Sequence, residues 1–196
     1  MLLNVQAGLT TSDGFLILQR RSDVVQSATG GVAASGAGGA KWSDFDFDRG
    51  TTSLVESAIR QVGEEIGWKP DNRDLIARPF LGAAFSLLRG RDLNFYCHFH
   101  TERLLEEISA NLYRRPWWSH KPLSLPPRKQ KRDSWEVAYL IAVPVEVVQP
   151  DGNLDPCFQS LLNDARHVRG LLKCLAQSRK FQEIQSRWTE QRRLEV

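Results

Sequence analysis

The stretch RQVGEEIGW, residues 60–68, decides the fold. It closes a predicted helix that begins near Thr52, because apolar residues recur through this segment at spacings of three and four. That apolar stripe consists of Val55, Ile59, Val62 and Ile66. Gly67 follows as the residue type that most readily adopts the left-handed conformation at a helix end. We therefore expect an amphipathic helix whose stripe packs on a sheet.

Three oxygen-bearing side chains lie beside this stripe. Gln61, Glu64 and Glu65 stand at positions i, i+3 and i+4, so a helix gathers them on one polar arc. Two carboxylates and an amide on a rigid face suit a hard cation, because Mg²⁺ binds oxygen ligands. Waters and substrate phosphates usually supply its remaining ligands. The alternative is an ordinary solvated helix face, where charged residues usually lie.

The same nine residues resemble the second half of the Nudix box, whose pattern is Arg-Glu-apolar-any-Glu-Glu-any-Gly-apolar. Six of the seven constrained places match, and the exception is Gln61, where the family has a glutamate that commonly binds metal. The first half of the box fits less well. The family spacing would put its upstream glutamate on Thr52 and its upstream glycine on Asp46.

The resemblance implies an α/β fold, a Nudix-like α/β/α sandwich with a mixed sheet. It also implies hydrolysis, dependent on Mg²⁺ (or Mn²⁺), of the pyrophosphate in a nucleoside diphosphate linked to another moiety. Glu64 and Glu65 would hold the metal, Gln61 would add an uncharged ligand, and Arg60 would orient Glu64 or its neighbours. The family often uses a further glutamate outside the box, and Glu136 is the candidate by position.

The departures at Thr52 and Gln61 keep a second hypothesis open. A chain that lacks two of the usual carboxylates is also compatible with a catalytically impaired Nudix-fold module that binds a nucleotide or a protein partner.

Composition and charge narrow the class of protein. An apolar fraction of 41% is enough for a packed core, and no apolar run approaches the length of a membrane helix, so we expect no membrane contact. The N-terminus lacks the features of a secretory signal. The three cysteines show neither a disulfide framework nor a metal-binding spacing. A cytoplasmic protein is the expectation.

Basic residues are concentrated in one loop. The loop comprises residues 114–133. Seven of the 26 Lys and Arg residues lie within residues 114–132 together with several prolines and no acidic residue, while the other 19 basic residues stand against 23 acidic ones. A nucleic-acid partner is therefore not expected. Trp117 and Trp118 in this loop would stack on a base at the mouth of the site. The alternative is a mobile loop with its tryptophans packed on the core.

Two hairpins are predicted. Residues 3–9 and 15–18 read as strands joined by the turn SDG, and Arg20 and Arg21 follow as substrate-phosphate contacts or as solvated residues at a strand end. Residues 77–89 and 93–101 form the second pair, in which His98 and His100 are interpreted as sheet-surface histidines rather than zinc ligands.

Two stretches before the helix can each be interpreted in two ways. Residues 29–40 are rich in glycine and would either bring backbone groups near metal and phosphate or form a flexible turn. The acidic stretch DFDFD, residues 44–48, reads as a short extended piece, or as an insertion that supplies a substitute for the missing upstream glutamate.

The chain divides into a Nudix-like domain, residues 1–150, and a C-terminal helical extension, residues 151–196. Helices predicted within residues 158–192 would pack on the same domain and cover the sheet, or form a partner surface such as that of a homodimer.

Overall fold

A computed structural model describes residues 3–21, 31–41, 44, 53–67, 80–86, 92–109, 137–158 and 168–194. The strands are β1 (Leu3–Thr10), β2 (Phe15–Arg21), β3 (Val32–Ala33), β4 (Gly36–Gly39), β5 (Phe80–Ser86), β6 (Asp92–His100) and β7 (Val137–Pro144). The helices are α1 (Ser53–Ile66), α2 (Leu105–Ser109), α4 (Arg169–Ala176) and α5 (Arg179–Leu194), with 3-10 turns η2 (Val145–Val147) and η3 (Pro156–Phe158).

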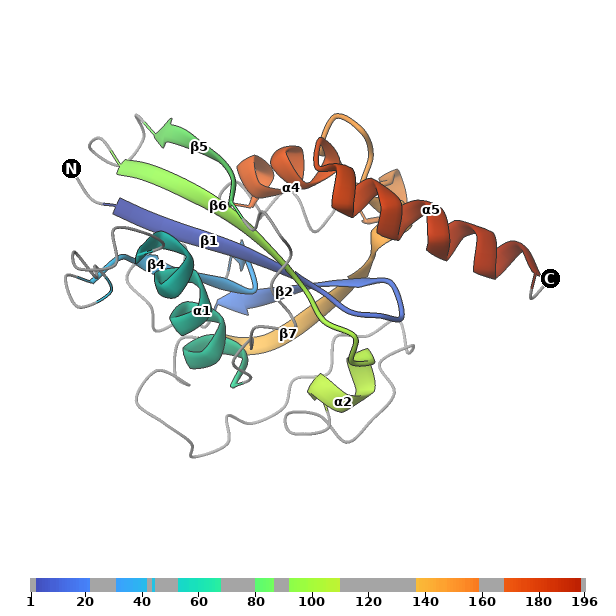
Figure 1. The fold of residues 1–196 in the computed structure, drawn as a ribbon, viewed down its shortest axis with the longest axis horizontal. Helices are drawn as coiled ribbons and strands as arrows, with labels where there is room; N and C mark the ends of the chain where they lie inside the picture. Colours follow the sequence, from blue (N-terminus) through green and yellow to red (C-terminus); the bar gives the residue numbers. More distant parts are fainter. Residues whose placement is uncertain are drawn as a thin grey trace.

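The seven described strands form one mixed sheet, in which five lie in the order β3-β2-β1-β6-β5 and the other two, β4 and β7, pair with β1 and β2. β1 runs parallel to β6 along its whole length, and its other edge is shared by β4 near the start and β2 near the end. β7 pairs with β2 and β5 pairs with β6, both antiparallel. Both predicted hairpins are confirmed, and the mixed sheet lies between helices as the α/β sandwich requires (Figure 1).

Strand alternation divides the core into two layers. On β2, Phe15 and Ile17 join the apolar stripe of α1, where Val62 and Ile66 are almost completely buried. Leu16 and Leu18 face the other side and pack with α4 and α5. The predicted stripe of the motif helix therefore does pack on the sheet, and the C-terminal helices cover the opposite face (Figure 1).

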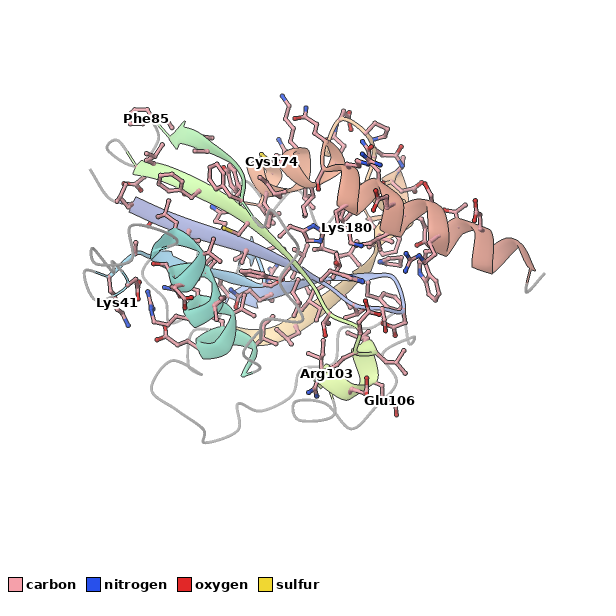
Figure 2. All side chains as sticks on the ribbon, viewed as in Figure 1. Lys41, Phe85, Arg103, Glu106, Cys174 and Lys180 are labelled. Atoms are coloured by element: carbon pink, nitrogen blue, oxygen red, sulfur yellow. The ribbon has the colours of Figure 1, made fainter. Side chains whose placement is uncertain are left out.

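Helix α5 is attached at the turn between β1 and β2. Gly14 has a φ of 74°, a left-handed conformation that favours glycine, and a Cβ there would collide with the indole of Trp188. The amide of Gln185 also donates to the carbonyl oxygens of Val145 and Val148 at 2.7 and 2.9 Å. Figure 2 shows Lys180 on this side of the molecule and Lys41 on the side of α1.

The prediction of sheet-surface histidines is wrong, because α4 and α5 cover that face. His98 is fully buried and His100 is 9% exposed. Thr10 Oγ1 lies 2.9 Å from His98 Nε2 and 3.1 Å from His100 Nδ1, and the His98 ring packs edge-on against Phe181. Burial lowers the pKa of the His98 imidazole to about 3.

No helix within the described ranges is both long and apolar enough to cross a membrane. The predicted division at residue 150 stays a prediction.

His98 makes stability depend on pH. The folded imidazole stays neutral while the unfolded one takes up a proton below its ordinary pKa of 6.5. The unfolded state therefore binds more protons between pH 6.5 and about 3, and stability falls as the pH falls through that window, by at most about 1.4 kcal/mol per pH unit. Urea unfolding from pH 7.5 to 4.5 should show a shallower loss in His98→Gln, which keeps a partner for Thr10. Equal slopes in the two proteins would contradict this account.

Candidate functional site

The site begins where the backbone of β4 lies directly against α1. A Cβ at Gly36 would stand 2.5 Å from the backbone nitrogen of Val62, and one at Gly38 would stand 2.6 Å from the side-chain Cδ of Gln61. At Gly36 only glycine permits this approach without displacing the helix, whereas a side chain at Gly38 would displace the Gln61 side chain. Within residues 31–40, the glycine-rich stretch is thus part of the sheet beside the motif helix, and the flexible-turn reading is wrong for these residues.

Glu65 points into the protein from the last turn of α1, and its side chain is only 3% exposed. The backbone N–H of Ala37 donates to its Oε2 at 2.8 Å, and the amide of Gln19 donates to the same oxygen. Arg21 Nη1 lies 3.9 Å from Oε1. Gln19 and Arg21 have the strand parity of Ile17, which faces α1. A buried carboxylate needs such partners, and Glu65 is held in place by them.

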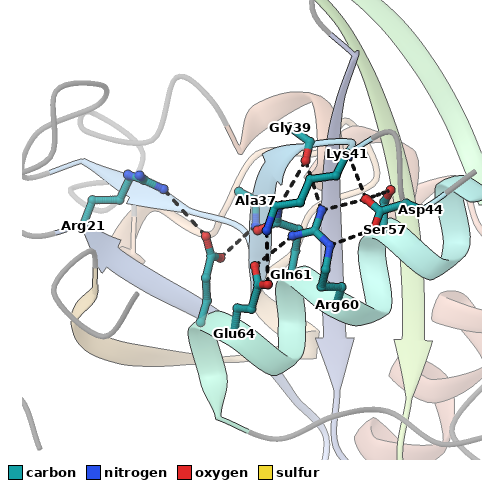
Figure 3. Close-up of polar contacts among 10 residues, drawn as sticks. Arg21, Ala37, Gly39, Lys41, Asp44, Ser57, Arg60, Gln61 and Glu64 are labelled. Carbon is teal, nitrogen blue, oxygen red and sulfur yellow. Dashed lines mark hydrogen bonds and ion pairs between the residues drawn. The ribbon is translucent and has the colours of Figure 1, made fainter. Parts of the chain in front are cut away.

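Arg60 connects three parts of the site (Figure 3). Its guanidinium donates to both carboxylate oxygens of Asp44 at 2.9 and 2.7 Å, to Glu64 Oε2 at 2.8 Å and to the carbonyl oxygen of Gly39 at 3.1 Å. Such a two-pronged pair with a carboxylate is the strongest geometry available to arginine. The pair with Asp44 fixes the direction in which Arg60 Nη1 donates to Glu64.

Asp44 is the carboxylate that pairs with Arg60. Ser57 Oγ and the backbone N–H of Lys41 also donate to its Oδ2, at 2.6 and 2.8 Å. The Arg60 guanidinium holds the pKa of the Asp44 carboxyl well below its usual range, and the same pair raises the pKa of Arg60. Asp44 lies at the start of the acidic stretch for which the sequence suggests a substitute acid.

Glu64 is the accessible carboxylate of the site. Its side chain is 30% exposed and contacts two basic groups, the guanidinium of Arg60 at 2.8 Å and Lys41 Nζ at 3.5 Å. Glu64 and Glu65 are adjacent in the chain but differ in environment, one at the surface and one enclosed. The exposed carboxylate is therefore the one that an incoming cation can reach.

Gln61 is turned toward a backbone acceptor. Its amide nitrogen donates to the carbonyl oxygen of Gly39 at 3.3 Å, and Arg60 donates to the same oxygen. The side chain is buried against Gly38. A carboxylate at position 61 would instead face that carbonyl oxygen and be repelled by it. A cation bound between the two oxygens would remove this repulsion.

The predicted site residues do not all gather here. Arg60, Gln61, Glu64, Glu65 and Arg21 surround β4, whereas Arg20 has the strand parity of Leu16 and Leu18, which face the other layer. Trp117, Trp118 and Glu136 lie outside the described residues.

The sequence analysis missed Gln19 and Lys41. Strand parity with Arg21 was the available signal for Gln19, and the position directly after the glycine-rich strand was the signal for Lys41.

The donor set fits a hard divalent cation in part. Glu64 and Glu65 are adjacent carboxylates, but the residues in view contain no group of three histidine, cysteine or acidic side chains arranged to hold a metal. The three carboxylates of Asp44, Glu64 and Glu65 are matched by three basic side chains within 4 Å, so this part of the site is close to neutral. A cation at Glu64 would have to displace one of its basic partners.

No family model matches the sequence, and no curated protein matches it. Among solved structures, a MutT protein from Methanosarcina mazei Go1 is 16% identical, with 83% of this chain and 90% of that chain aligned and a TM-score of 0.45. A NUDIX hydrolase from Alicyclobacillus acidocaldarius is 13% identical over 74% and 79% of the two chains, with a TM-score of 0.47.

A bifunctional NMN adenylyltransferase/ADP ribose pyrophosphatase from Francisella tularensis, complexed with AMP and a Mn ion, is 15% identical. It aligns over 53% of this chain and 28% of its own, with a TM-score of 0.38. Because these TM-scores are all below 0.5, the function proposed below depends on the residues of the site itself.

Replacing Asp44 with asparagine removes the charge but keeps an oxygen for Ser57. We expect a loss of about 1–3 kcal/mol in the free energy of unfolding at pH 7, because a largely buried guanidinium loses its ionised partner. The depressed pKa means that this contribution is present above the ordinary value of 3.8 and fades as the pH falls below it. Urea unfolding measures it. The exposed Asp151→Asn is the control and should leave stability almost unchanged; equal losses would contradict a special role for Asp44.

Replacing Gln61 with glutamate should create a better cation site. The added carboxylate would face the Gly39 carbonyl oxygen, and a cation between them relieves the repulsion. We expect Mn²⁺ to bind roughly 10-fold more tightly, since each added charged ligand raises the affinity of an oxygen site. Titration of free Mn²⁺ followed by electron paramagnetic resonance measures this affinity. An unchanged affinity would mean that residue 61 does not face the ion.

Proposed function

We propose that the protein is a Nudix-type hydrolase, dependent on Mg²⁺ or Mn²⁺, that cleaves the pyrophosphate of a nucleoside diphosphate linked to another moiety. The observation that carries the proposal is the placement of Glu64 and Glu65. One helix end brings both carboxylates beside the backbone of β4, one accessible and one buried, within a motif that matches six of seven constrained places of the Nudix pattern.

The proposed roles follow from the contacts of each side chain. Glu64 would take the cation because its carboxylate is reachable, and Glu65 would support the same ion from the enclosed side. When bound, the cation neutralises the pyrophosphate and lowers the pKa of an attacking water. Arg60 holds Glu64 in one orientation through its own attachment to Asp44. Such outer partners fix the geometry of metal ligands.

Roles are also proposed for the other site residues that the sequence predicts. Glu136 would add a further carboxylate or accept a proton from water, while Trp117 and Trp118 would stack on the base of the substrate. Arg21 already contacts Glu65, which supports a role in holding that carboxylate rather than in binding phosphate. The phosphate contact predicted for Arg20 stays a prediction, and the strand parity of Arg20 places it in the layer of Leu16 and Leu18, away from Glu64 and Glu65.

A second function is favoured by a specific observation. Each described carboxylate of the site already has a basic partner, and Gln61 offers a hydrogen-bond donor where the family has an acid. Both features weaken cation binding. A nucleotide-binding module with little or no turnover is therefore the alternative, and turnover distinguishes the two.

The deciding measurement is a turnover screen with Mg²⁺ or Mn²⁺ over nucleoside diphosphate sugars, dinucleoside polyphosphates, NADH and nucleoside triphosphates. For the substrate that is cleaved, Glu64→Gln should lose about 100-fold or more in kcat/KM, since even outer partners of a metal are worth 10–100-fold. Glu56→Gln is the matched control, because Glu56 is an exposed glutamate on the same helix.

Activity that is equal in wild type and Glu64→Gln would remove the catalytic assignment. Tight nucleotide binding without turnover, in both proteins, would establish the binding module instead.

A further inference from the structure

The three basic side chains of the site differ in how firmly they are held. Arg60 makes four hydrogen bonds to Asp44, Glu64 and Gly39. The side chain of Arg21 is only 10% exposed and contacts the buried Glu65. Lys41 is 59% exposed, and among the described residues its ammonium pairs with Glu64 alone, at 3.5 Å. Of the three, Lys41 is the one whose head group can leave at little cost.

Energetics supports this distinction. An exposed lysine–carboxylate pair contributes little to stability, because water screens the charges and the long side chain loses freedom when it is held. A guanidinium that binds a largely buried carboxylate through two oxygens is far harder to displace. At Glu64, Lys41 is therefore the basic partner that a divalent cation would displace, and Arg60 would stay in place.

The backbone of Lys41 stays where it is when the head group moves. Its N–H donates to Asp44 Oδ2 at 2.8 Å, and the preceding residue, Ala40, donates to the carbonyl oxygen of Leu3 at 2.8 Å. Figure 3 shows the side chain of Lys41 extending from this fixed point across the site toward Glu64. A released ammonium thus remains tethered beside the carboxylate and next to any anion bound there.

On the basis of the proposed function, we propose that Lys41 is a built-in counter-ion of Glu64 that a divalent cation displaces and that then binds the phosphate groups of the substrate. In the free protein the ammonium neutralises Glu64 and competes with the metal. In the presence of metal and pyrophosphate it is drawn to the anion. Lys41 therefore couples the two binding events, and the coupling is reciprocal by linkage.

Direct binding measurements without turnover test this role. Mn²⁺ binding to the full chain is measured by electron paramagnetic resonance, and inorganic pyrophosphate binding to the Mn²⁺-loaded protein by calorimetry. Lys41→Met should bind Mn²⁺ about 2–5-fold more tightly than wild type, the range expected for an exposed ion pair, and should bind pyrophosphate more weakly by a similar factor.

Two controls accompany this variant. Lys41→Arg keeps the charge and should behave as wild type does. Lys173→Met removes an exposed lysine from α4, on the opposite face of the sheet, and should change neither affinity. Mn²⁺ affinity that is unchanged or weaker in Lys41→Met would overturn the proposal, as would unchanged pyrophosphate affinity.

Glu64→Gln separates this inference from the proposed function. Should Mn²⁺ bind equally to wild type and Glu64→Gln, the metal assignment itself fails and the Lys41 proposal fails with it. Should Glu64→Gln lose Mn²⁺ binding while Lys41→Met matches wild type, only the role of Lys41 is removed.

Discussion

The close approach of β4 to α1 is the constraint on which the site depends. Gly36 and Gly38 leave no side chain between the strand and the helix, so the backbone itself faces Gln61, Val62 and Glu65. The Ala37 N–H reaches Glu65, and the Gly39 carbonyl oxygen receives donors from Arg60 and Gln61. A larger residue at Gly36 would meet the backbone of the helix and push it outward, and one at Gly38 would displace the Gln61 side chain.

Charge balance follows from that geometry. Burying a carboxylate such as Glu65 is costly unless donors and a counter-charge come with it, and Gln19, Ala37 and Arg21 supply them. Asp44 and Arg60 satisfy each other in the same way. Among the described carboxylates of the site, Glu64 is the accessible one, and Lys41 is the more loosely held of its two basic partners. The fold thus encloses Asp44 and Glu65 with their counter-charges and leaves Glu64 accessible.

On the opposite face of the sheet, polar side chains of β6 are buried beneath α4 and α5. Tyr96, His98 and His100 share strand parity on β6, and α4 and α5 cover them rather than leaving them to water. Thr10 provides the hydrogen-bonding partner that both rings need. The cover is held by Trp188 over Gly14 and by Gln185 on the carbonyl groups of η2. Both faces carry an apolar layer, and the charged groups of the site gather beside α1.

Local patterns in the sequence were sufficient for the elements and for the motif helix. Period-3.6 apolar spacing placed Val62 and Ile66 on the sheet, and period-2 alternation with turn residues placed both hairpins, because these signals act between neighbours in the chain. The same spacing set Gln61, Glu64 and Glu65 on one arc. Contacts between distant segments were decided only by the tertiary structure. The sheet order brings Gln19 and Arg21 to Glu65, and the end of β4 brings Lys41 to Glu64. The docking of α4 and α5 buries His98. Each of these contacts depends on how separate elements pack, and none of them leaves a periodic signal in the sequence.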